Sequence, residues 1–547
     1  MSRGFSIKTR KKELEKCSTI DFDLIVIGGG ITGAGIALDA VTRGFKTLLL
    51  EKSDFASGTS SKSTKLIHGG LRYLKQFEIG LVRESGRERA IVHNLAPHLV
   101  HPEKMLLPIV KHGSFSQFTA SLAVSVYDYL AGVSRVERKE IFNKEEALKL
   151  ELLLDKDTLK AAIRYSEYRT DDARLSFELI RKARELGCHV FNYCKLDQLS
   201  YKEGIVNGVE AIDMTDGARF KFKSKYVVSA AGPWVDGIRN NDHSLKGKQL
   251  RLTKGVHIVF RHEDLPLKQA IYFDDFKGRM LFAIPRWGVS YVGTTDTDYA
   301  GNLDRVVCGE NDLQYLIEAT NNMFDGIELK ASDVISSWAG LRPLISEPGK
   351  KASEVSRKDE IFESDSGLIS IAGGKLTGYR KMAKRVLDLL RDKDRRLPQS
   401  NCITDTVKLS SVPFKDYREV NNMKQQIQSE FPELVQGPVM ASYMVDNYGI
   451  HAGTILESAR HLLTKHKDPD QALMQAELHS ALENEACYRP EDFFIRRTGM
   501  LYFAPERLLK HFDFILDEYA RFFSWDSVSI EKFKSEALQL LKDSLVT

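Results

Sequence analysis

The sequence predicts a fold that combines α/β and α+β architecture and ends in a helical domain. An apolar run at 24–27 leads through glycines into a helix-like segment and a second apolar run, which is the pattern of a strand–helix–strand unit. Residues 241–350 are rich in β-branched and aromatic runs, which favour strands. Beyond residue 400 glycines become scarce and apolar residues such as Phe533 and Ala537 recur at helical spacing.

The first strand–helix–strand unit carries a glycine pattern that serves phosphate binding. Gly28, Gly30 and Gly33 lie between the first predicted strand and the helix, and Glu51 ends the second predicted strand. The first glycine permits a tight turn, the second lets the backbone approach a pyrophosphate, and the third lets helix and strand pack closely. The helix N-terminus favours phosphate charge, and Glu51 can accept hydrogen bonds from a ribose. The unit therefore predicts a dinucleotide site, with a ligand-free glycine turn as the plain alternative.

The remaining elements follow in order along the chain. Asn207-Gly208 and Asp216-Gly217 predict the turns of antiparallel hairpins, which lead into a buried strand at 226–230. The runs HIVF, MLFAIP and VSYVGTTD predict further strands in the middle region. A third buried strand, GLISIAGG, precedes a helix at 376–390, and the charged stretch RDKDRRLPQS separates this helix from the C-terminal domain.

Composition excludes several functional classes. The 547 residues include 79 Lys and Arg against 75 Asp and Glu, a net charge of +4 that gives no reason to expect nucleic acid as a partner. The 6 cysteines form no CxxC pair, so neither a metal site nor a disulfide framework is predicted. The leader 1–18 is basic where a signal peptide would be apolar, and no membrane-spanning run is present. A cytoplasmic protein is expected.

Two later glycine turns add to the dinucleotide pattern. The turn at 230–233 follows the strand at 226–230, and Gly373-Gly374 precedes the last helix of the α/β part. With the first turn they resemble the three flavin contacts of FAD folds of the glutathione-reductase and amino-acid-oxidase type, in which discontinuous pieces of one chain wrap the cofactor. The resemblance implies an FAD-binding domain at 19–95, 156–240 and 352–395, a β-rich substrate domain at 96–155 and 241–351, and a helical domain at 400–547.

Longer stretches resemble the FAD-dependent, respiratory-type glycerol-3-phosphate dehydrogenases over essentially the whole chain. At Gly378 the sequence departs from the family's pattern, which has a second Thr. The stretches are TSSKSTKLIHGGLRYL at 59–74, DDARL at 171–175, AAGPW at 230–234, KGVHIV at 254–259, VGTTDTDY at 292–299, GLRPL at 340–344, GGKLTGYR at 373–380 and ACYRPEDFFIRRTGM at 486–500.

The resemblance implies a complete reaction. sn-Glycerol 3-phosphate is oxidised to dihydroxyacetone phosphate by hydride transfer to noncovalently bound FAD, and the electrons pass to a membrane quinone. The family's oxidases carry an inserted segment for which the interval between Arg357 and Gly373 leaves no room, and this favours a quinone over oxygen. An FAD oxidase of glycerol 3-phosphate or of an amino acid, and a flavin-bearing interaction protein without turnover, remain as alternatives. A homodimer is left open.

Two residues suit the chemistry at the substrate's C2 carbon. His257 can accept the hydroxyl proton, because a neutral imidazole is a base near neutral pH. Arg342 is permanently charged and can stabilise the developing alkoxide. Both positions match functional residues of the resembled family. From the pattern alone, a core histidine and a turn-capping arginine are the competing interpretations.

The other candidate site residues follow from the same stretches. Cations and hydroxyls suit the substrate phosphate, and Ser/Thr-rich or glycine-rich backbone suits FAD. Arg357 is equally compatible with a surface ion pair, and His68 with a loop brace. The phosphate candidates are Arg72, Tyr73, Arg357, Lys375 and Thr377; the FAD candidates are Gly28, Gly30, Gly33, Glu51, Thr59, Ser60, Ser61, Lys65, His68, Gly69, Ala231, Gly232, Gly374, Lys375 and Leu376.

One apolar stripe is a candidate for a peripheral membrane contact that gives a quinone access. Phe115, Phe118, Leu122, Val126 and Tyr129 share one face of a predicted helix. The same stripe suits any helix that packs on a core, and core packing is the favoured interpretation.

Overall fold

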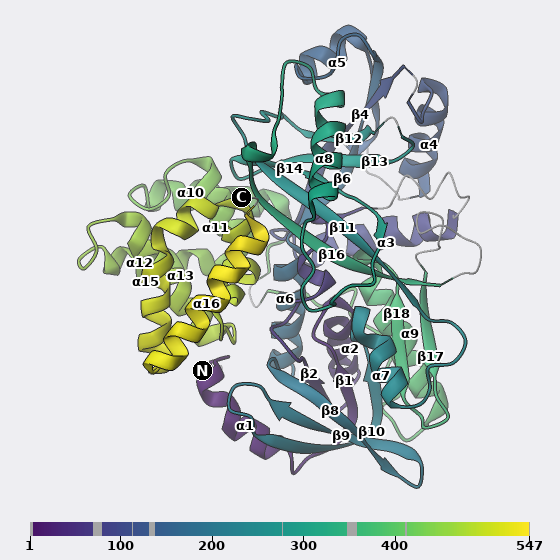
Figure 1. The fold of residues 1–547 in the computed structure, drawn as a ribbon. Coiled ribbons are helices and arrows are strands. Elements are labelled where there is room, and N and C mark those ends of the chain that lie inside the picture. The colour runs from purple at the N-terminus through teal and green to yellow at the C-terminus, as the bar shows by residue number, and fades with distance from the viewer. Residues whose placement is uncertain are drawn as a thin grey trace.

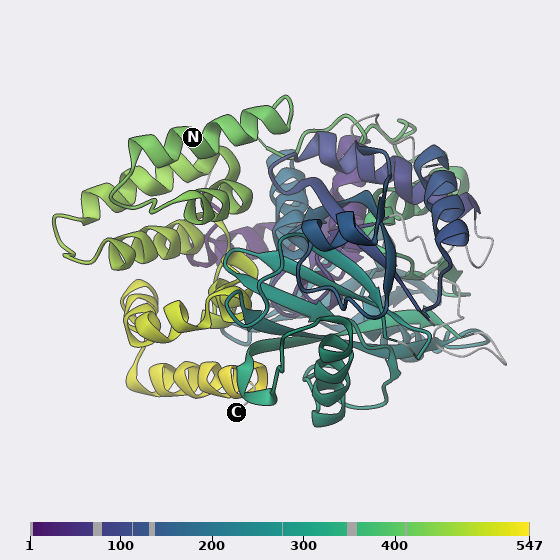
Figure 2. The same cartoon turned by 90° about the horizontal axis from the view of Figure 1, so that it is seen from above.

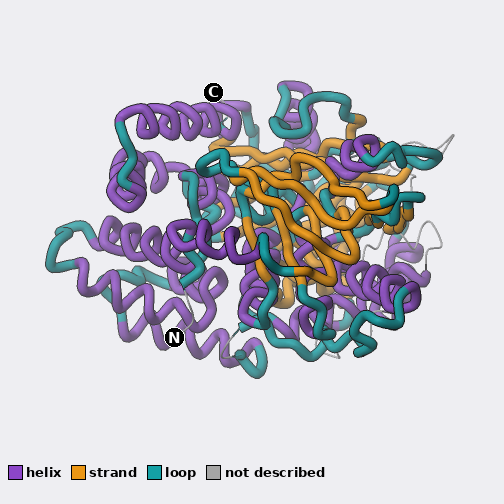
Figure 3. Tube along the Cα trace, turned by 90° about the horizontal axis from the view of Figure 1, so that it is seen from below, coloured by secondary structure: helices purple, strands orange, loops and turns teal. Residues whose placement is uncertain are grey.

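The chain folds around two β-sheets, with a group of C-terminal helices beside them (Figure 1). In the view from below, the strands gather on one side of the molecule and helices surround them (Figure 3). The computed structural model describes residues 4–68, 79–111, 113–130, 137–275, 277–346, 358–410 and 413–545.

The first sheet has eight strands in the order β17-β18-β10-β1-β2-β7, and β9 and β8 extend it from β10. Its centre is parallel, because β10 and β2 both run parallel to β1 and β18 runs parallel to β10. β1, β2 and β18 are short and mostly buried, as the apolar runs predict. The strands are β1 (Asp21–Ile27), β2 (Thr47–Leu50), β7 (His189–Phe191), β8 (Cys194–Lys202), β9 (Ile205–Asp213), β10 (Arg219–Ser229), β17 (Asp359–Glu363) and β18 (Ile369–Gly373).

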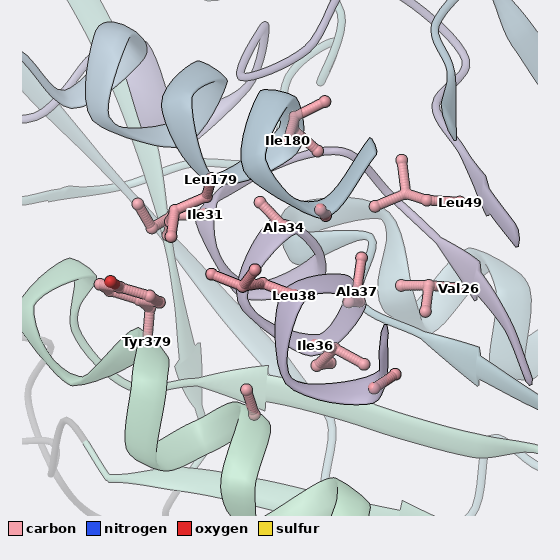
Figure 4. Packing of buried hydrophobic residues seen from close by; sticks show 14 of the residues in the cluster. Val26, Ile31, Ala34, Ile36, Ala37, Leu38, Leu49, Leu179, Ile180 and Tyr379 are labelled. Carbon is pink, nitrogen blue, oxygen red and sulfur yellow. The ribbon is translucent and has the colours of Figure 1, made fainter. Parts of the chain in front are cut away.

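Helix α2 (Ile31–Thr42) packs against this sheet and between two other helices, α6 (Asp172–Glu185) and α9 (Tyr379–Lys393). Figure 4 shows Leu38 and Ala34 of α2 among Leu179 and Tyr379 of the neighbouring helices. Burying a side chain of leucine size contributes roughly 1.5–3 kcal/mol to stability. The packing therefore fixes the N-terminus of α2 relative to the first sheet.

One predicted turn in this sheet is wrong. Asn207-Gly208 lies inside β9, where Gly208 pairs with Lys223 of β10, while the β8–β9 turn is at Glu203-Gly204. A Cβ on Gly208 would overlap the carbonyl oxygen of Phe222. The glycine is needed there for the close approach of two strands, which a turn-like dipeptide does not distinguish from a turn.

The second sheet has ten strands in the order β15-β11-β14-β13-β12-β4-β6-β3, with β16 paired to β11 and β5 to β6. The expected domain limits assign β3 and β6 to the FAD-binding part, but both strands belong to this second sheet. β6 pairs with β4 along almost its whole length, and sequence alternation does not reveal which sheet a strand joins. The strands are β3 (Leu66–Ile67), β4 (Val100–Val110), β5 (Glu140–Asn143), β6 (Leu159–Thr170), β11 (Leu250–Arg261), β12 (Ala270–Asp274), β13 (Met280–Arg286), β14 (Val289–Gly293), β15 (Thr297–Asp298) and β16 (Val334–Ile345).

The favoured interpretation of the apolar stripe at 115–129 is wrong for its central residues. On α4 (Gln117–Leu130), Phe118, Leu122 and Val126 are 78%, 55% and 36% exposed. The core-facing side of the helix carries Ala120, Val124 and Tyr127 instead, and the side chain of Tyr129 is outside the described residues. The sequence could not separate the two faces, because both are apolar. The other helices of this part are α3 (Ile79–Leu95), α5 (Lys144–Leu150), α7 (Val235–Asn241) and α8 (Glu310–Met323).

The C-terminal part is helical, as predicted, and Figure 2 shows its green and yellow helices on the same side of the sheets. The N-terminal segment lies against this part: the Ala486 N–H donates to the Phe5 carbonyl, and helix α1 (Arg10–Cys17) follows. The helices are α10 (Tyr417–Glu430), α11 (Pro438–Tyr448), α12 (Ala452–Leu462), α13 (Pro469–Asn484), α14 (Met500–Phe503), α15 (Pro505–Phe523) and α16 (Ser527–Ser544), with a π-helical turn at Asp492–Arg497.

The contact between β1 and α2 predicts the effect of a single methyl group. A Cβ on Gly33 would overlap the carbonyl oxygen of Gly28, which is backbone and cannot move aside. We expect Gly33→Ala to lower the free energy of unfolding by about 1–3 kcal/mol or more and to weaken cofactor binding. Gly453→Ala in α12 is the control, because nothing lies near its Cβ and alanine favours a helix. Denaturant unfolding of both variants is the measurement, and equal stabilities would contradict the packing argument.

Candidate active site

A cavity of about 620 Å³ lies between the two sheets, a size in the usual range for ligand sites. Gly28, Glu51, Ala230 and Gly374 line it just beyond the carboxyl ends of the parallel strands of the first sheet. Ligands of open parallel sheets bind at this edge. The predicted site residues that line the cavity are Gly28, Gly30, Glu51, Thr59, Ser60, His68, Ala231, Gly232, His257, Arg342, Gly374, Lys375, Leu376 and Thr377.

The glycine turn has the geometry that the dinucleotide pattern predicts. Gly28 has a φ of +109°, and a Cβ there would lie 2.6 Å from the Ala230 carbonyl oxygen. A Cβ on Gly30 would lie 3.0 Å from the Ser60 hydroxyl, to which the Ile31 N–H donates a hydrogen bond of 2.9 Å. Backbone without side chains therefore faces the cavity at the N-terminus of α2, where anions are favoured.

Glu51 closes the other side of this turn. Its carboxylate accepts hydrogen bonds from the N–H groups of Gly29 (2.7 Å) and Ser53 (2.9 Å). Burial raises the pKa of the Glu51 carboxyl, and these backbone bonds oppose the rise. A carboxylate has about four acceptor positions, so positions remain for the hydroxyls of a ribose.

The cavity wall also contains two buried side-chain nitrogens without hydrogen-bond partners among the described residues. They are Trp234 Nε1 and His257 Nδ1. Buried polar atoms in native proteins are nearly always satisfied, so such atoms are expected where a ligand belongs. The open glycine turn, the buried carboxylate and these nitrogens fit an FAD molecule.

His257 stands on β11 in the second sheet and is 1% exposed. Its ring stacks on Trp338 of β16 at 4.7 Å between centroids, and Nε2 lies 3.0 Å from the Thr64 hydroxyl. A Cβ on the paired Gly293 would overlap the ring, so glycine makes room for it. Burial and the positive charges of Arg342 and Lys65 hold the pKa of His257 well below its ordinary 6.5. The imidazole is therefore neutral at pH 7 and available as a base.

Arg342 stands on β16 and reaches across Gly255 of β11, where a Cβ would overlap its guanidinium group. Its Nη2 donates to the Thr294 hydroxyl at 2.8 Å, and its Nη1 donates to the Thr295 carbonyl at 3.0 Å. Nη1 also lies 3.2 Å from the carboxylate of Asp296. The guanidinium is thus held at the wall of the same cavity as His257.

Three residues that were predicted to bind the cofactor, Lys65, Ser61 and Gly33, do not line the cavity. The Lys65 Nζ pairs with the Asp172 carboxylate at 2.5 Å and donates to the Ser61 carbonyl at 3.3 Å. Ser61 is buried, and Gly33 acts through helix packing. A charged pattern in a loop does not reveal that its lysine turns inward to a carboxylate on α6. Arg72, Tyr73, Arg357 and Gly69 lie outside the described residues.

Several lining residues were not predicted. Thr294, Thr295 and Asp296 belong to the stretch VGTTDTDY, so the resemblance contained a signal for them. Lys62 and Trp234 also lie in stretches that carry the resemblance, at 59–74 and 230–234, whereas Tyr272 and Phe282 carried no such signal. Trp338 does not line the cavity but stacks on His257 from the next strand. Burial lowers the pKa of Lys62 to about 8, and the positive charge of Arg496 adds to the effect.

Cys194 is the cysteine in the cavity lining among the described residues. Burial raises the pKa of its thiol to about 12, so it is not a thiolate at neutral pH. The thiolate is the reactive form of cysteine. Cys194 therefore offers no reactive thiolate to a bound ligand at neutral pH.

Known proteins resemble the chain along its whole length. A family described as FAD dependent oxidoreductase matches residues 23–380, and one described as the C-terminal domain of alpha-glycerophosphate oxidase matches residues 402–529. An aerobic glycerol-3-phosphate dehydrogenase of Bacillus subtilis is 44% identical over 100% of this chain and 99% of its own.

Solved structures agree with the fold. A glycerol-3-phosphate dehydrogenase from Bacillus halodurans, complexed with FAD, has a TM-score of 0.84 and 39% identity and covers 99% of both chains. An L-alpha-glycerophosphate oxidase from Mycoplasma pneumoniae has a TM-score of 0.54 at 18% identity, over 68% of this chain and 95% of its own, and is similar in fold alone. These similarities confirm the predicted fold class and FAD as the cofactor.

Proposed function

The chain belongs to the FAD-dependent glycerol-3-phosphate dehydrogenases, and from this membership we propose that it oxidises sn-glycerol 3-phosphate to dihydroxyacetone phosphate. FAD, when bound, accepts the hydride that leaves C2. One observation carries the proposal: a neutral histidine and a fixed arginine, His257 and Arg342, line the same cavity as the dinucleotide turn.

In this proposal His257 removes the proton of the C2 hydroxyl. A neutral imidazole can take this proton at pH 7, and the Thr64 hydroxyl and the stacked Trp338 fix the orientation of the ring. Arg342 stabilises the negative charge that develops on the substrate oxygen. Its bonds to Thr294, Thr295 and Asp296 hold it in place before the reaction, so little reorganisation is required.

The substrate phosphate is assigned to the cationic end of the cavity. Lys375 lines the cavity at the end of β18, with Thr377 two residues further on. Arg72, Tyr73 and Arg357 complete the proposed phosphate site. Arginine binds phosphate through paired donors and lysine as a point charge, so the set suits a phosphate monoester.

We further propose that the electrons leave to a membrane quinone. No helix in the part of the chain that the structure describes is long and apolar enough to cross a bilayer. On α4, Phe118 and Leu122 are exposed. On the opposite face of the helix the Tyr127 hydroxyl donates to Glu167, which lines the cavity, at 2.8 Å. The helix therefore connects the cavity wall with an apolar surface that suits a lipid interface.

The assigned chemical roles predict separate kinetic effects. We expect His257→Ala and Arg342→Ala each to slow anaerobic flavin reduction by about two to four orders of magnitude, the range for general-base and electrostatic groups. Lys375→Ala should chiefly raise KM, because it removes binding common to substrate and transition state. Stopped-flow reduction by glycerol 3-phosphate measures the rate of flavin reduction, and steady-state reduction of an artificial dye measures KM. Near-normal reduction rates in the His257 and Arg342 variants would defeat the assignment.

The lowered pKa of His257 predicts the pH dependence of the chemical step. Because burial and nearby positive charge disfavour the imidazolium, the base form persists as the pH falls through 6.5. The acid limb of the flavin-reduction rate should therefore lie below pH 6.5. The rate of flavin reduction at saturating substrate, measured from about pH 5 to about pH 9, tests this prediction. Comparison with the same profile of the His257→Ala variant shows which part of the pH dependence comes from His257. An acid limb centred above pH 6.5 would show that His257 is not held neutral.

The acceptor proposal is tested with lipid and with matched surface variants. With glycerol 3-phosphate, a short-chain quinone or an artificial dye should be reduced much faster than oxygen is consumed. Vesicles that contain anionic lipid should recruit the protein and support quinone reduction. Phe118→Ser with Leu122→Ser should lower vesicle binding and quinone reduction while dye reduction stays unchanged, because the apolar face is lost and the site is not.

Val528→Ser is the control for this experiment, since Val528 is 75% exposed on the distant α16. Peroxide formed at the rate of dye reduction would show that the electron acceptor is oxygen and not a quinone. Vesicle binding that is equal in all variants would remove α4 from the proposal.

A further inference from the structure

Two consecutive arginines of the helical domain reach into the FAD-binding part and meet a single aspartate. Arg496 Nε lies 2.5 Å from Asp54 Oδ2. Arg497 donates to both oxygens of Asp54, at 2.8 Å and 3.0 Å, in the bidentate arrangement that arginine forms with carboxylates. The residues are more than 440 positions apart in the sequence, so the contact joins two parts of the fold.

The cluster is closed to solvent. Asp54 is 0% exposed and Arg497 is 1% exposed. Further carboxylates balance the second arginine charge: Arg496 also pairs with Asp492, and Arg497 Nε lies 3.4 Å from Glu485. Because an unpaired charge in such an environment is strongly unfavourable, the arginines hold Asp54 in one position.

Asp54 stands in the middle of a short loop, residues 51–58, that lines the cavity at both ends. Glu51 and Lys52 line it on one side of Asp54, and Ser57 and Gly58 on the other. Between them Asp54, Phe55 and Ala56 turn away from the cavity and are buried. The position of Asp54 therefore sets the path of the residues that face the cofactor.

The rest of the loop is held by backbone hydrogen bonds that depend on this path. The Ala56 N–H donates to the Gly29 carbonyl at 3.0 Å, inside the glycine turn, and the Tyr193 N–H donates to the Ser53 carbonyl at 2.8 Å. The Asn192 side chain donates to Asp54 at 3.0 Å and also to the Ala486 carbonyl at 2.9 Å. Loop, glycine turn and helical domain form one connected set of bonds.

We propose that Arg496 and Arg497 are positioning residues for FAD: through Asp54, the helical domain holds loop 51–58 in the conformation that retains the cofactor. The helical domain is also attached to the FAD-binding part by contacts other than those of Asp54. Arg174 of α6 pairs with Glu485 at 2.8 Å, and the Tyr193 hydroxyl donates to Asp492 at 2.7 Å. The arginines meet the loop that carries Glu51, and the charge of Arg496 also acts on Lys62 in the cavity wall.

The test measures the rate at which FAD leaves the holoenzyme after dilution, followed by flavin fluorescence in the absence of substrate. Arg497→Gln and Asp54→Asn should release FAD at least about tenfold faster than the wild type. Arg497→Lys keeps the charge but loses the paired donors, so its FAD release rate should lie between those of the wild type and Arg497→Gln. Because no substrate is present, the result is independent of the proposed reaction.

Arg507→Gln is the matched control. Arg507 is a largely buried arginine of the same domain that pairs with Asp470 at 2.7 Å and Glu477 at 3.3 Å, within the C-terminal helices. We expect this variant to lose thermal stability and to keep the wild-type FAD release rate. Hydrogen exchange supplies a second readout, since the amide of Ala56 should lose protection in the Arg497 and Asp54 variants and keep it in Arg507→Gln.

Release of FAD from Asp54→Asn and Arg497→Lys at the rate of Arg507→Gln would overturn the proposal. If Arg497→Gln does not fold, these two milder variants decide the outcome, because each retains hydrogen bonding at the cluster. Unchanged protection of the Ala56 amide in both would equally show that the arginines hold the domains together without positioning the loop.

Discussion

The pairing of β11 with β16 is the constraint on which the end of the cavity formed by His257 and Arg342 depends. These strands run antiparallel along their whole length, and the register places Gly255 opposite Gly340 and His257 opposite Trp338. Glycines stand where bulk would exclude function: Gly255 lies beneath the Arg342 guanidinium, and a Cβ on Gly340 would lie 2.7 Å from the side chain of Lys62. A buried imidazole and a fixed guanidinium can share one wall because glycines leave room for them on the sheet surface. The two strands that carry His257 and Arg342 therefore depend on glycines at the neighbouring positions as well as on these two side chains.

The N-terminus of α6 joins this wall to the rest of the molecule. Asp172 accepts a hydrogen bond from the Ser63 N–H and pairs with Lys65, which braces the loop that carries Thr64 beside His257. Arg174, two residues later, pairs with Glu485 of the helical domain. The stretch DDARL therefore contributes no residue to the cavity lining. Its Asp172 holds the loop that carries the lining residues Ser63 and Thr64, and its Arg174 holds the helical domain.

Local patterns were sufficient to predict the geometry of the glycine turn and insufficient for the elements that surround it. Gly28, Gly30 and Glu51 act within one strand–helix–strand unit, so their spacing already contains the geometry. The assignment of β6 to a sheet, the inward turn of Lys65 and the exposed face of α4 depend instead on partners distant in the sequence. Gly208 shows the same limit, because a glycine needed for strand approach and one needed for a turn look alike in a dipeptide. Propensity and periodicity report local preference, whereas these features are decided by tertiary contacts.

The helical domain contacts the residues around the cavity in two physically different ways. Tyr502 packs on Trp338 with 5.1 Å between ring centroids, and Trp338 is the ring on which His257 rests. Arg496 and Arg497 reach the cofactor loop through Asp54. An apolar contact at one end and a buried ionic contact at the other fix two separate points, and two fixed points define the orientation of a rigid domain better than either alone. A domain attached in this way belongs to the framework of the cavity, since its displacement would release both the packing behind His257 and the loop that carries Glu51.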